Sequence, residues 1–125
     1  MARILIADDE ESMRLLVGRA IAMDGHEIVT AEDGAEALEI LTEQGGAFDL
    51  LLTDIKMPVM DGIALALAAA RDFPDLTILL MTGFADQRER AHGLNAIVHD
   101  VVTKPFSVAG IRAAVAAALA ARKTA

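Results

Sequence analysis

Asp54 directly follows a strongly apolar run at residues 50–53, and Pro58 interrupts the chain soon afterwards. A continuous apolar run that ends at a breaker is typical of a strand buried on both faces. Burying an unpaired carboxylate inside such a strand is costly, so we expect Asp54 at its carboxyl end, where the backbone reaches the surface. Ligands bind at that edge in open parallel α/β sheets. The alternative interpretation of a lone aspartate is a turn residue or a helix cap.

The other apolar runs of the chain also end at polar or charged residues: Asp8 and Asp9, Thr82, and Lys104. All strands of a parallel sheet end on the same side, so we expect these side chains to meet Asp54 at one edge. Each of them also has a purely structural interpretation. An aspartate can cap the following helix, a threonine is a common strand residue, and a lysine can be a solvated charge.

Three carboxylates in one pocket would repel each other by roughly 3 kcal/mol per pair at about 5 Å and an effective dielectric constant near 20. A positive group must therefore share the site. Hard oxygen ligands without a nearby histidine or cysteine favour Mg²⁺. Lys104 adds a second positive charge and Thr82 a hydroxyl donor, so the set could receive a phosphoryl group with Asp54 as the nucleophile.

Five apolar runs alternate with five helical patterns along the chain. The predicted strands are residues 3–7, 27–31, 48–53, 77–82 and 97–103. The predicted helices are residues 13–24, 34–44, 62–72, 83–95, which is the weakest pattern, and 108 onward. This alternation indicates parallel strands with right-handed crossovers. Because the first, third and fourth strands are the most apolar, we expect a doubly wound five-stranded α/β sheet of order 2-1-3-4-5 with five helices.

Local signals also predict where helices begin and which faces they bury. Asp33, Asp61 and Ser107 are placed to cap three of the helices. Spacing of three and four residues predicts two buried stripes, one in each of two helices. These are Met13, Leu16, Val17, Ala20 and Ile21 in the first helix, and Ile63, Ala66, Leu67 and Ala70 in the third.

Composition limits the classes of function. The 125 residues suit one domain, and the longest apolar stretches are too short for a membrane span. A net charge of −8 disfavours binding to nucleic acid or to an anionic membrane. The chain has no cysteine, which is compatible with a reducing cytoplasm and excludes thiolate metal sites. No Gly-rich phosphate-binding loop is present.

Four motifs together resemble the receiver domain of two-component response regulators, a flavodoxin-like fold. The motifs are Ala-Asp-Asp-Glu at 7–10, Thr-Asp-Ile-Lys-Met-Pro-Val-Met-Asp-Gly at 53–62, Met-Thr-Gly at 81–83, and Thr-Lys-Pro-Phe at 103–106. The resemblance covers essentially the whole chain. It implies that the domain is no enzyme beyond supporting phosphoryl transfer to itself and its own dephosphorylation.

The resemblance also implies a role for each site residue. Asp54 would accept the phosphoryl group, and Lys104 would contact that group and Asp8 or Asp54. Asp9 would bind Mg²⁺ directly, Asp8 would bind it through water, and Lys56 would offer its backbone carbonyl. The Lys104–Pro105 bond would be cis, and Thr82 would respond to the phosphoryl group.

One position departs from the family pattern. Receiver domains commonly carry Tyr or Phe three residues before the lysine, as a ring that moves together with the strand-four Thr or Ser. Val101 occupies that position here. A valine cannot make the same ring movement, so the aromatic half of that switch is not expected in this chain.

The resemblance suggests a single receiver domain over residues 1–125 with no output domain. The phosphodonor would be a histidine kinase or a histidine phosphotransferase. Stand-alone receivers of this type can act as adaptors for an AAA+ protease, which implies ClpX of the ClpXP protease as a partner of the unphosphorylated form. Two alternatives stay open: a relay that shuttles phosphate without an output of its own, and a domain that signals without phosphate. A third, a small Mg²⁺-dependent phosphatase, would need an acid where Lys56 stands.

Overall fold

The computed structural model describes residues 2–83 and 91–123, and within them five parallel strands form one sheet. The strands are β1 (Arg3–Ala7), β2 (Glu27–Ala31), β3 (Leu50–Asp54), β4 (Thr77–Thr82) and β5 (Asp100–Thr103), in the order β2-β1-β3-β4-β5. The predicted fold class and strand order are confirmed. The three apolar strands lie in the middle and are almost wholly buried, whereas the edge strands β2 and β5 are largely half-buried or exposed.

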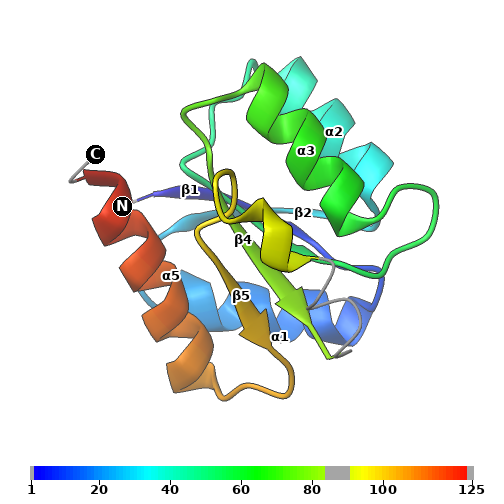
Figure 1. Cartoon of the computed structure of the whole chain (residues 1–125). Helices are drawn as coiled ribbons and strands as arrows, with labels where there is room; N and C mark the ends of the chain where they lie inside the picture. The colour runs from blue at the N-terminus through cyan, green and yellow to red at the C-terminus, as the bar shows by residue number, and fades with distance from the viewer. Residues whose placement is uncertain (1, 84–90, 124–125) are drawn as a thin grey trace.

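The described helices are α1 (Glu11–Ala22), α2 (Gly34–Glu43), α3 (Gly62–Asp72) and α5 (Val108–Lys123), with a short 3₁₀ turn, η1 (His92–Leu94). The helix predicted at residues 83–95 falls largely on residues 84–90, which lie outside the described residues. Figure 1 shows α2 and α3 together on one face of the sheet and α1 with α5 on the other. No helix in the described part of the chain is long and apolar enough to cross a membrane.

Each face of the sheet carries its own apolar core. Leu5, Leu51 and Leu80 pack under α2 and α3. Their neighbours Ile4 and Leu52 point to the opposite face and pack under α1 and α5. This alternation follows from the two-residue period of a strand, and it explains why these strands are apolar at nearly every position.

The strand register aligns the carboxyl ends of β1, β3, β4 and β5 at one edge of the sheet. Ala7 of β1 pairs with Thr53 of β3, and Asp54 pairs with Met81 of β4. Thr82 in turn pairs with Thr103 of β5. The residues that follow or end these strands therefore lie at one edge, where the sequence predicts the site.

Two predicted strands have different bounds in the structure. The third strand begins at Leu50 instead of residue 48 and includes Asp54 as its last residue. The fifth begins at Asp100 instead of residue 97. The cause at the fifth strand is a turn, because the backbone N–H groups of Ile97 and Val98 both donate to the carbonyl of Leu94 at 3.0 and 2.9 Å.

The predicted helix starts are confirmed, and the two predicted buried stripes are confirmed except at one leucine in each. The side chains of Asp33, Asp61 and Ser107 accept backbone N–H groups three residues ahead at 2.8 to 2.9 Å. Leu16 and Leu67, predicted to be buried, are 45% and 51% exposed. Both lie at the margin of their stripe, where a small rotation of the helix turns them outward; in α3 this rotation buries Leu65 and Ala69 instead.

Candidate functional site

Three carboxylates meet at the carboxyl edge of the sheet. One oxygen from each of Asp8, Asp9 and Asp54 can be chosen so that all lie within 4.8 Å of one another. Asp8 is fully buried, Asp54 is 8% exposed and Asp9 faces solvent. A set of hard oxygen donors open to solvent on one side fits Mg²⁺, which binds a few carboxylates and keeps several waters.

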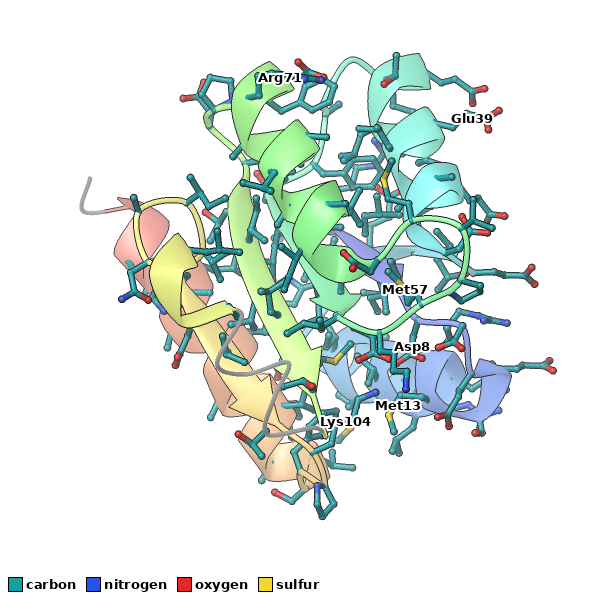
Figure 2. All side chains as sticks on the ribbon, turned by 45° about the vertical axis from the view of Figure 1, so that its right-hand side comes forward. Asp8, Met13, Glu39, Met57, Arg71 and Lys104 are labelled. Carbon is teal, nitrogen blue, oxygen red and sulfur yellow. The ribbon has the colours of Figure 1, made fainter. Side chains whose placement is uncertain are left out.

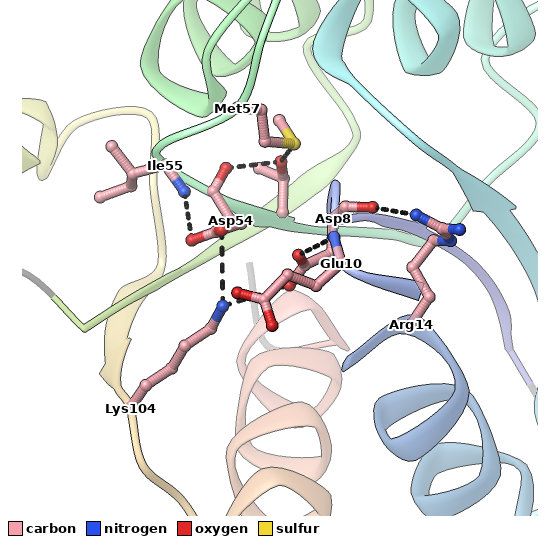
Figure 3. A network of polar contacts seen from close by, with 8 residues as sticks. Asp8, Glu10, Arg14, Asp54, Ile55, Met57 and Lys104 are labelled. Carbon is pink, nitrogen blue, oxygen red and sulfur yellow. Dashed lines mark hydrogen bonds and ion pairs between the residues drawn. The ribbon is translucent and has the colours of Figure 1, made fainter. Parts of the chain in front are cut away.

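Lys104 balances two of these charges. Its Nζ lies 3.2 Å from Oδ2 of Asp8 and 3.4 Å from Oδ2 of Asp54. Figure 2 shows Asp8 and Lys104 close together at this edge, and Figure 3 shows the Lys104 side chain extending to Asp54. The backbone N–H of Lys104 also donates to the carbonyl of Thr82 at 2.8 Å. The lysine is therefore held at both ends, and its ammonium group lies between Asp8 and Asp54.

The buried Asp8 is held by further contacts. Its Oδ1 accepts the backbone N–H of Glu10 at 3.0 Å, and its backbone carbonyl accepts Nη1 of Arg14 at 2.7 Å (Figure 3). A carboxylate that accepts an N–H two residues ahead forms an Asx-turn, which fixes the local backbone. Asp8 is therefore a buried residue of the site whose position is fixed by these contacts.

Asp54 is harder to ionise than an ordinary aspartate. Burial raises its pKa from 3.8 to about 6, and the charge of Asp8 acts in the same direction. Lys104 and the backbone N–H of Ile55, which donates to Oδ1 of Asp54 at 2.9 Å, oppose that rise of the pKa. At neutral pH a carboxylate with this pKa is mostly ionised, and a metal ion at Asp9 would favour the ionised form further.

The loop after β3 approaches Asp54 closely. A Cβ on Gly62 would collide with the backbone carbonyl of Asp54, and the N–H of Gly62 donates to the carbonyl of Ile55 at 2.7 Å. The hydroxyl of Thr53 donates to the same Asp54 carbonyl at 2.9 Å. Val59 at the tip of the loop has a φ of 68° and is 85% exposed. The loop is thus folded tightly against the site, with backbone strain at a β-branched residue.

A cavity of about 370 Å³ opens over the carboxylates. Its lining residues are Asp9, Glu10, Asp54, Lys56, Gly83 and Lys104. A cavity of this size has room for a hydrated ion together with a phosphoryl group. Asp54, Asp9 and both lysines therefore face the same cavity.

The structure brings together Asp8, Asp9, Asp54 and Lys104 as predicted, and Lys56 lines the same cavity. Thr82 ends β4, buried beside the cavity-lining Gly83. The Lys104–Pro105 bond is cis, as the resemblance implied. The metal-binding role of the Lys56 carbonyl stays a prediction.

Sequence reasoning missed Arg14 and Glu10 as members of the site. In the sequence Arg14 is an ordinary helix residue, because its partner is a backbone carbonyl, a group that every residue has. Glu10 follows Asp9 directly, so its place at the cavity could have been inferred from adjacency alone.

The response regulator receiver domain family matches residues 4–116. With the sheet order and the acidic edge described above, the chain belongs to the response regulator receiver domain family and is a receiver domain of two-component signalling.

Among curated proteins, the response regulator receiver protein CpdR of Brucella abortus is 47% identical over 85 residues, which cover 68% of this chain and 69% of CpdR. The transcriptional regulatory protein PrrA of Mycobacterium tuberculosis is 34% identical over 94% of this chain, which spans 49% of PrrA. The sensor kinase CckA of Brucella abortus is 32% identical over 86% of this chain and 11% of its own length. The chain is therefore similar both to a protein of about its own size and to one domain of larger proteins.

Solved structures show the same fold. A receiver domain protein from Clostridium thermocellum superposes with a TM-score of 0.89 at 26% identity, over 99% of this chain and 98% of the other. The response regulator TrrA from Thermotoga maritima, solved in complex with Mg²⁺ and BeF, gives a TM-score of 0.82 at 31% identity, over 94% of this chain and 99% of the other.

Proposed function

We propose that this chain accepts a phosphoryl group on Asp54 from a histidine kinase or a histidine phosphotransferase and thereby switches its binding to a partner protein. The observation that supports this most strongly is the position of Asp54. It is a nearly buried carboxylate, 3.4 Å from a lysine ammonium, and it opens onto a cavity shared with Asp9.

The transfer needs a nucleophile and charge neutralisation. A carboxylate oxygen of Asp54 attacks phosphorus, the bond from phosphorus to the donor nitrogen breaks, and the donor histidine keeps the electron pair. Lys104 is placed to neutralise a phosphoryl oxygen, because its Nζ already lies beside Asp54. Thr82 at the end of β4 would donate its hydroxyl to the phosphoryl group.

Mg²⁺ would be held by Asp9 and Asp54, by the carbonyl of Lys56 and, through water, by Asp8. It would neutralise phosphoryl oxygens during the transfer. The donor chemistry of this acidic edge supports the assignment, as does the similar receiver TrrA, which was solved with Mg²⁺ and BeF.

A phosphatase that uses an aspartyl-phosphate is the alternative reading of the same site. Such enzymes place a second acid two residues after the nucleophile, to protonate the leaving group. Lys56 occupies that position and faces the cavity, so no acid stands there. This favours a signalling module over a hydrolytic enzyme.

Intact-mass spectrometry tests the acceptor. In the presence of Mg²⁺ and a small phosphodonor such as acetyl phosphate, wild type should gain one phosphoryl adduct, and Asp54→Asn should gain none. Asp75→Asn, which removes an exposed carboxylate remote from the site, is the matched control and should react like wild type. An adduct that persists in Asp54→Asn would place the acceptor elsewhere.

The proposal for the partner is supported by similarity. The similarity to CpdR and to the sensor kinase CckA supports a place in a histidine kinase pathway, with this chain as a receiver. We further propose that the partner is an AAA+ unfoldase of the ClpX type, with the chain as a protease adaptor. A relay to a second phosphotransferase is the competing outcome.

Affinity capture distinguishes an adaptor from a relay. Without a phosphate mimic, wild type and Asp54→Ala should both retain purified ClpX. Added Mg²⁺ and beryllofluoride should release ClpX from wild type but not from Asp54→Ala. Rapid loss of the phosphoryl group to an added phosphotransferase, with no retention of ClpX, would favour the relay instead.

A further inference from the structure

Arg14 is a largely buried arginine that contacts the acidic edge of the sheet. Its side chain is only 14% exposed although it lies one turn into α1. Nη1 donates to the backbone carbonyl of Asp8 at 2.7 Å, and Nη2 lies 3.7 Å from Oε1 of Glu32 in the loop after β2. A guanidinium fork held from two sides has a fixed orientation.

The carbonyl that Arg14 holds belongs to the peptide that joins Asp8 to Asp9. A peptide group is planar, so fixing its carbonyl oxygen also fixes the direction in which the next residue leaves it. Asp8 is further restrained through its carboxylate by Glu10 and Lys104. Asp9 differs from Asp8, because within the described residues no hydrogen bond or ion pair holds its carboxylate. The backbone therefore sets the direction of the Asp9 Cα–Cβ bond and so limits the positions that its carboxylate can reach.

We propose that Arg14 is a positioning residue of the metal site, which holds the turn at Asp8 so that the carboxylate of Asp9 faces the cavity. This inference rests on the proposed function, since it concerns the Mg²⁺ that would assist phosphoryl transfer. Figure 3 shows Arg14 approaching Asp8 from α1, on the side away from Lys104.

The direction in which Mg²⁺ affinity changes when Arg14 is replaced distinguishes a positioning role from simple charge repulsion. Arg14 carries a positive charge close to an acidic cluster, so its charge alone should weaken the binding of a cation. Removing that charge should then tighten Mg²⁺ binding. If Arg14 instead aims Asp9, removing it should weaken Mg²⁺ binding in spite of the lost repulsion.

The experiment measures the dissociation constant for Mg²⁺ from amide shifts in an NMR titration. Arg14→Met keeps the apolar stem but removes charge and donors, and it should weaken binding about tenfold, as the loss of an outer-sphere partner commonly does. Arg14→Lys keeps one donor and should recover part of the affinity. Arg19→Met removes an exposed charge from the same helix and should stay within about twofold of wild type.

A double-mutant cycle tests whether Arg14 acts through Asp9. In an Asp9→Asn background, followed to higher Mg²⁺ concentration, Arg14→Met should have little further effect. Binding by Arg14→Met as tight as wild type, or an equal loss with and without Asp9, overturns the inference. Should Arg14→Met not fold, Arg14→Gln carries the same comparison.

Failure of the proposed metal site and failure of the Arg14 positioning role give different results. If wild type itself does not bind Mg²⁺, the metal site of the proposed function falls, and the inference falls with it. If wild type binds Mg²⁺ and forms the adduct on Asp54 while the Arg14 variants bind equally well, only the inference is wrong.

Discussion

Asp54 and Lys104 form a largely buried pair of a carboxylate and an ammonium group at the edge of the sheet. Burial raises the pKa of Asp54 to about 6, while Lys104, 3.4 Å away, limits that rise. The lysine also contacts Asp8 at 3.2 Å, so its charge is shared between two acids. Neither acid is fully neutralised, and the site keeps an affinity for further positive charge.

The raised pKa of Asp54 predicts a pH-dependent difference in stability between wild type and Asp54→Asn. Above pH 6 the folded protein must hold an ionised, poorly solvated Asp54, whereas below pH 3.8 the group is protonated in both the folded and the unfolded state. Wild type should therefore lose stability relative to Asp54→Asn as pH rises from about 4 to 7, by up to about 3 kcal/mol.

Denaturant unfolding of both proteins without metal, at pH 4 and pH 7, measures this difference. The advantage of Asp54→Asn should be present at pH 7, nearly absent at pH 4, and reduced at pH 7 by millimolar Mg²⁺, which favours the ionised form in wild type. An advantage that is equal at both pH values would show that ionisation of Asp54 is not its cause.

The acidic and basic members of the site could be predicted from residue types, because each stands where an apolar run ends. Arg14 could not be predicted in this way. Its partner is a backbone carbonyl six residues earlier, and only the packing of α1 against the end of β1 brings the two together. Contacts to backbone atoms depend on tertiary geometry that residue identities do not encode locally.

At the scale of elements, two positions of the loop between β3 and α3 have unusual backbone requirements. Gly62 has no room for a Cβ, and Val59 has a positive φ, which glycine adopts more readily than valine. Gly62 packs against the backbone carbonyl of Asp54, where any Cβ would collide. Val59 adopts a φ of 68°, which is unfavourable for a β-branched side chain, and its side chain is almost fully exposed.

Two substitutions in this loop should therefore change the free energy of unfolding in opposite directions. Gly62→Ala should destabilise by about 2 kcal/mol, because the Asp54 backbone must move to admit the methyl group, and it should also slow formation of the phosphoryl adduct. Val59→Asn should stabilise by about 1 kcal/mol, because asparagine tolerates a positive φ and the exposed valine loses little packing. Urea denaturation measures both, and equal effects of the same sign would contradict the loop geometry.

Element starts could be predicted better than buried faces. The caps at Asp33, Asp61 and Ser107 depend on contacts within four residues, so the sequence indicates them directly. The exposure of Leu16 and Leu67 depends instead on how far each helix is rotated over the sheet. That rotation follows from packing against distant residues, which periodicity alone does not determine.

At the scale of the molecule, the sheet separates two apolar layers, one under α2 with α3 and one under α1 with α5 (Figure 1). The site lies at the carboxyl edge of the sheet, because its residues come from the ends of β1, β3 and β4 and from the residue after β5. Close-packed cores have low compressibility and transmit strain, so a signal from the site should travel along the strands that carry the responding residues.

Thr82 and Lys104 both belong to the β4 and β5 side of the sheet, and the two are joined by the 2.8 Å bond from the Lys104 N–H to the Thr82 carbonyl. A phosphoryl group on Asp54 would draw both side chains toward it and so change β5 and the segment before it. Val101 in β5 is partly buried and has no ring to move, so the backbone of this region should carry the change. The site need only shift an existing equilibrium between two conformations.

Hydrogen exchange with and without Mg²⁺ and beryllofluoride measures where that change occurs. Beyond the loops of the site, the altered protection should concentrate between residues 83 and 102, a range whose positions 84–90 lie outside the described residues. Asp54→Ala under the same conditions is the control and should show no such change. If the altered protection appeared instead in α1 or between residues 25 and 34, the signal would leave through β1 and β2, and the surface around β5 would not be the one that a partner reads.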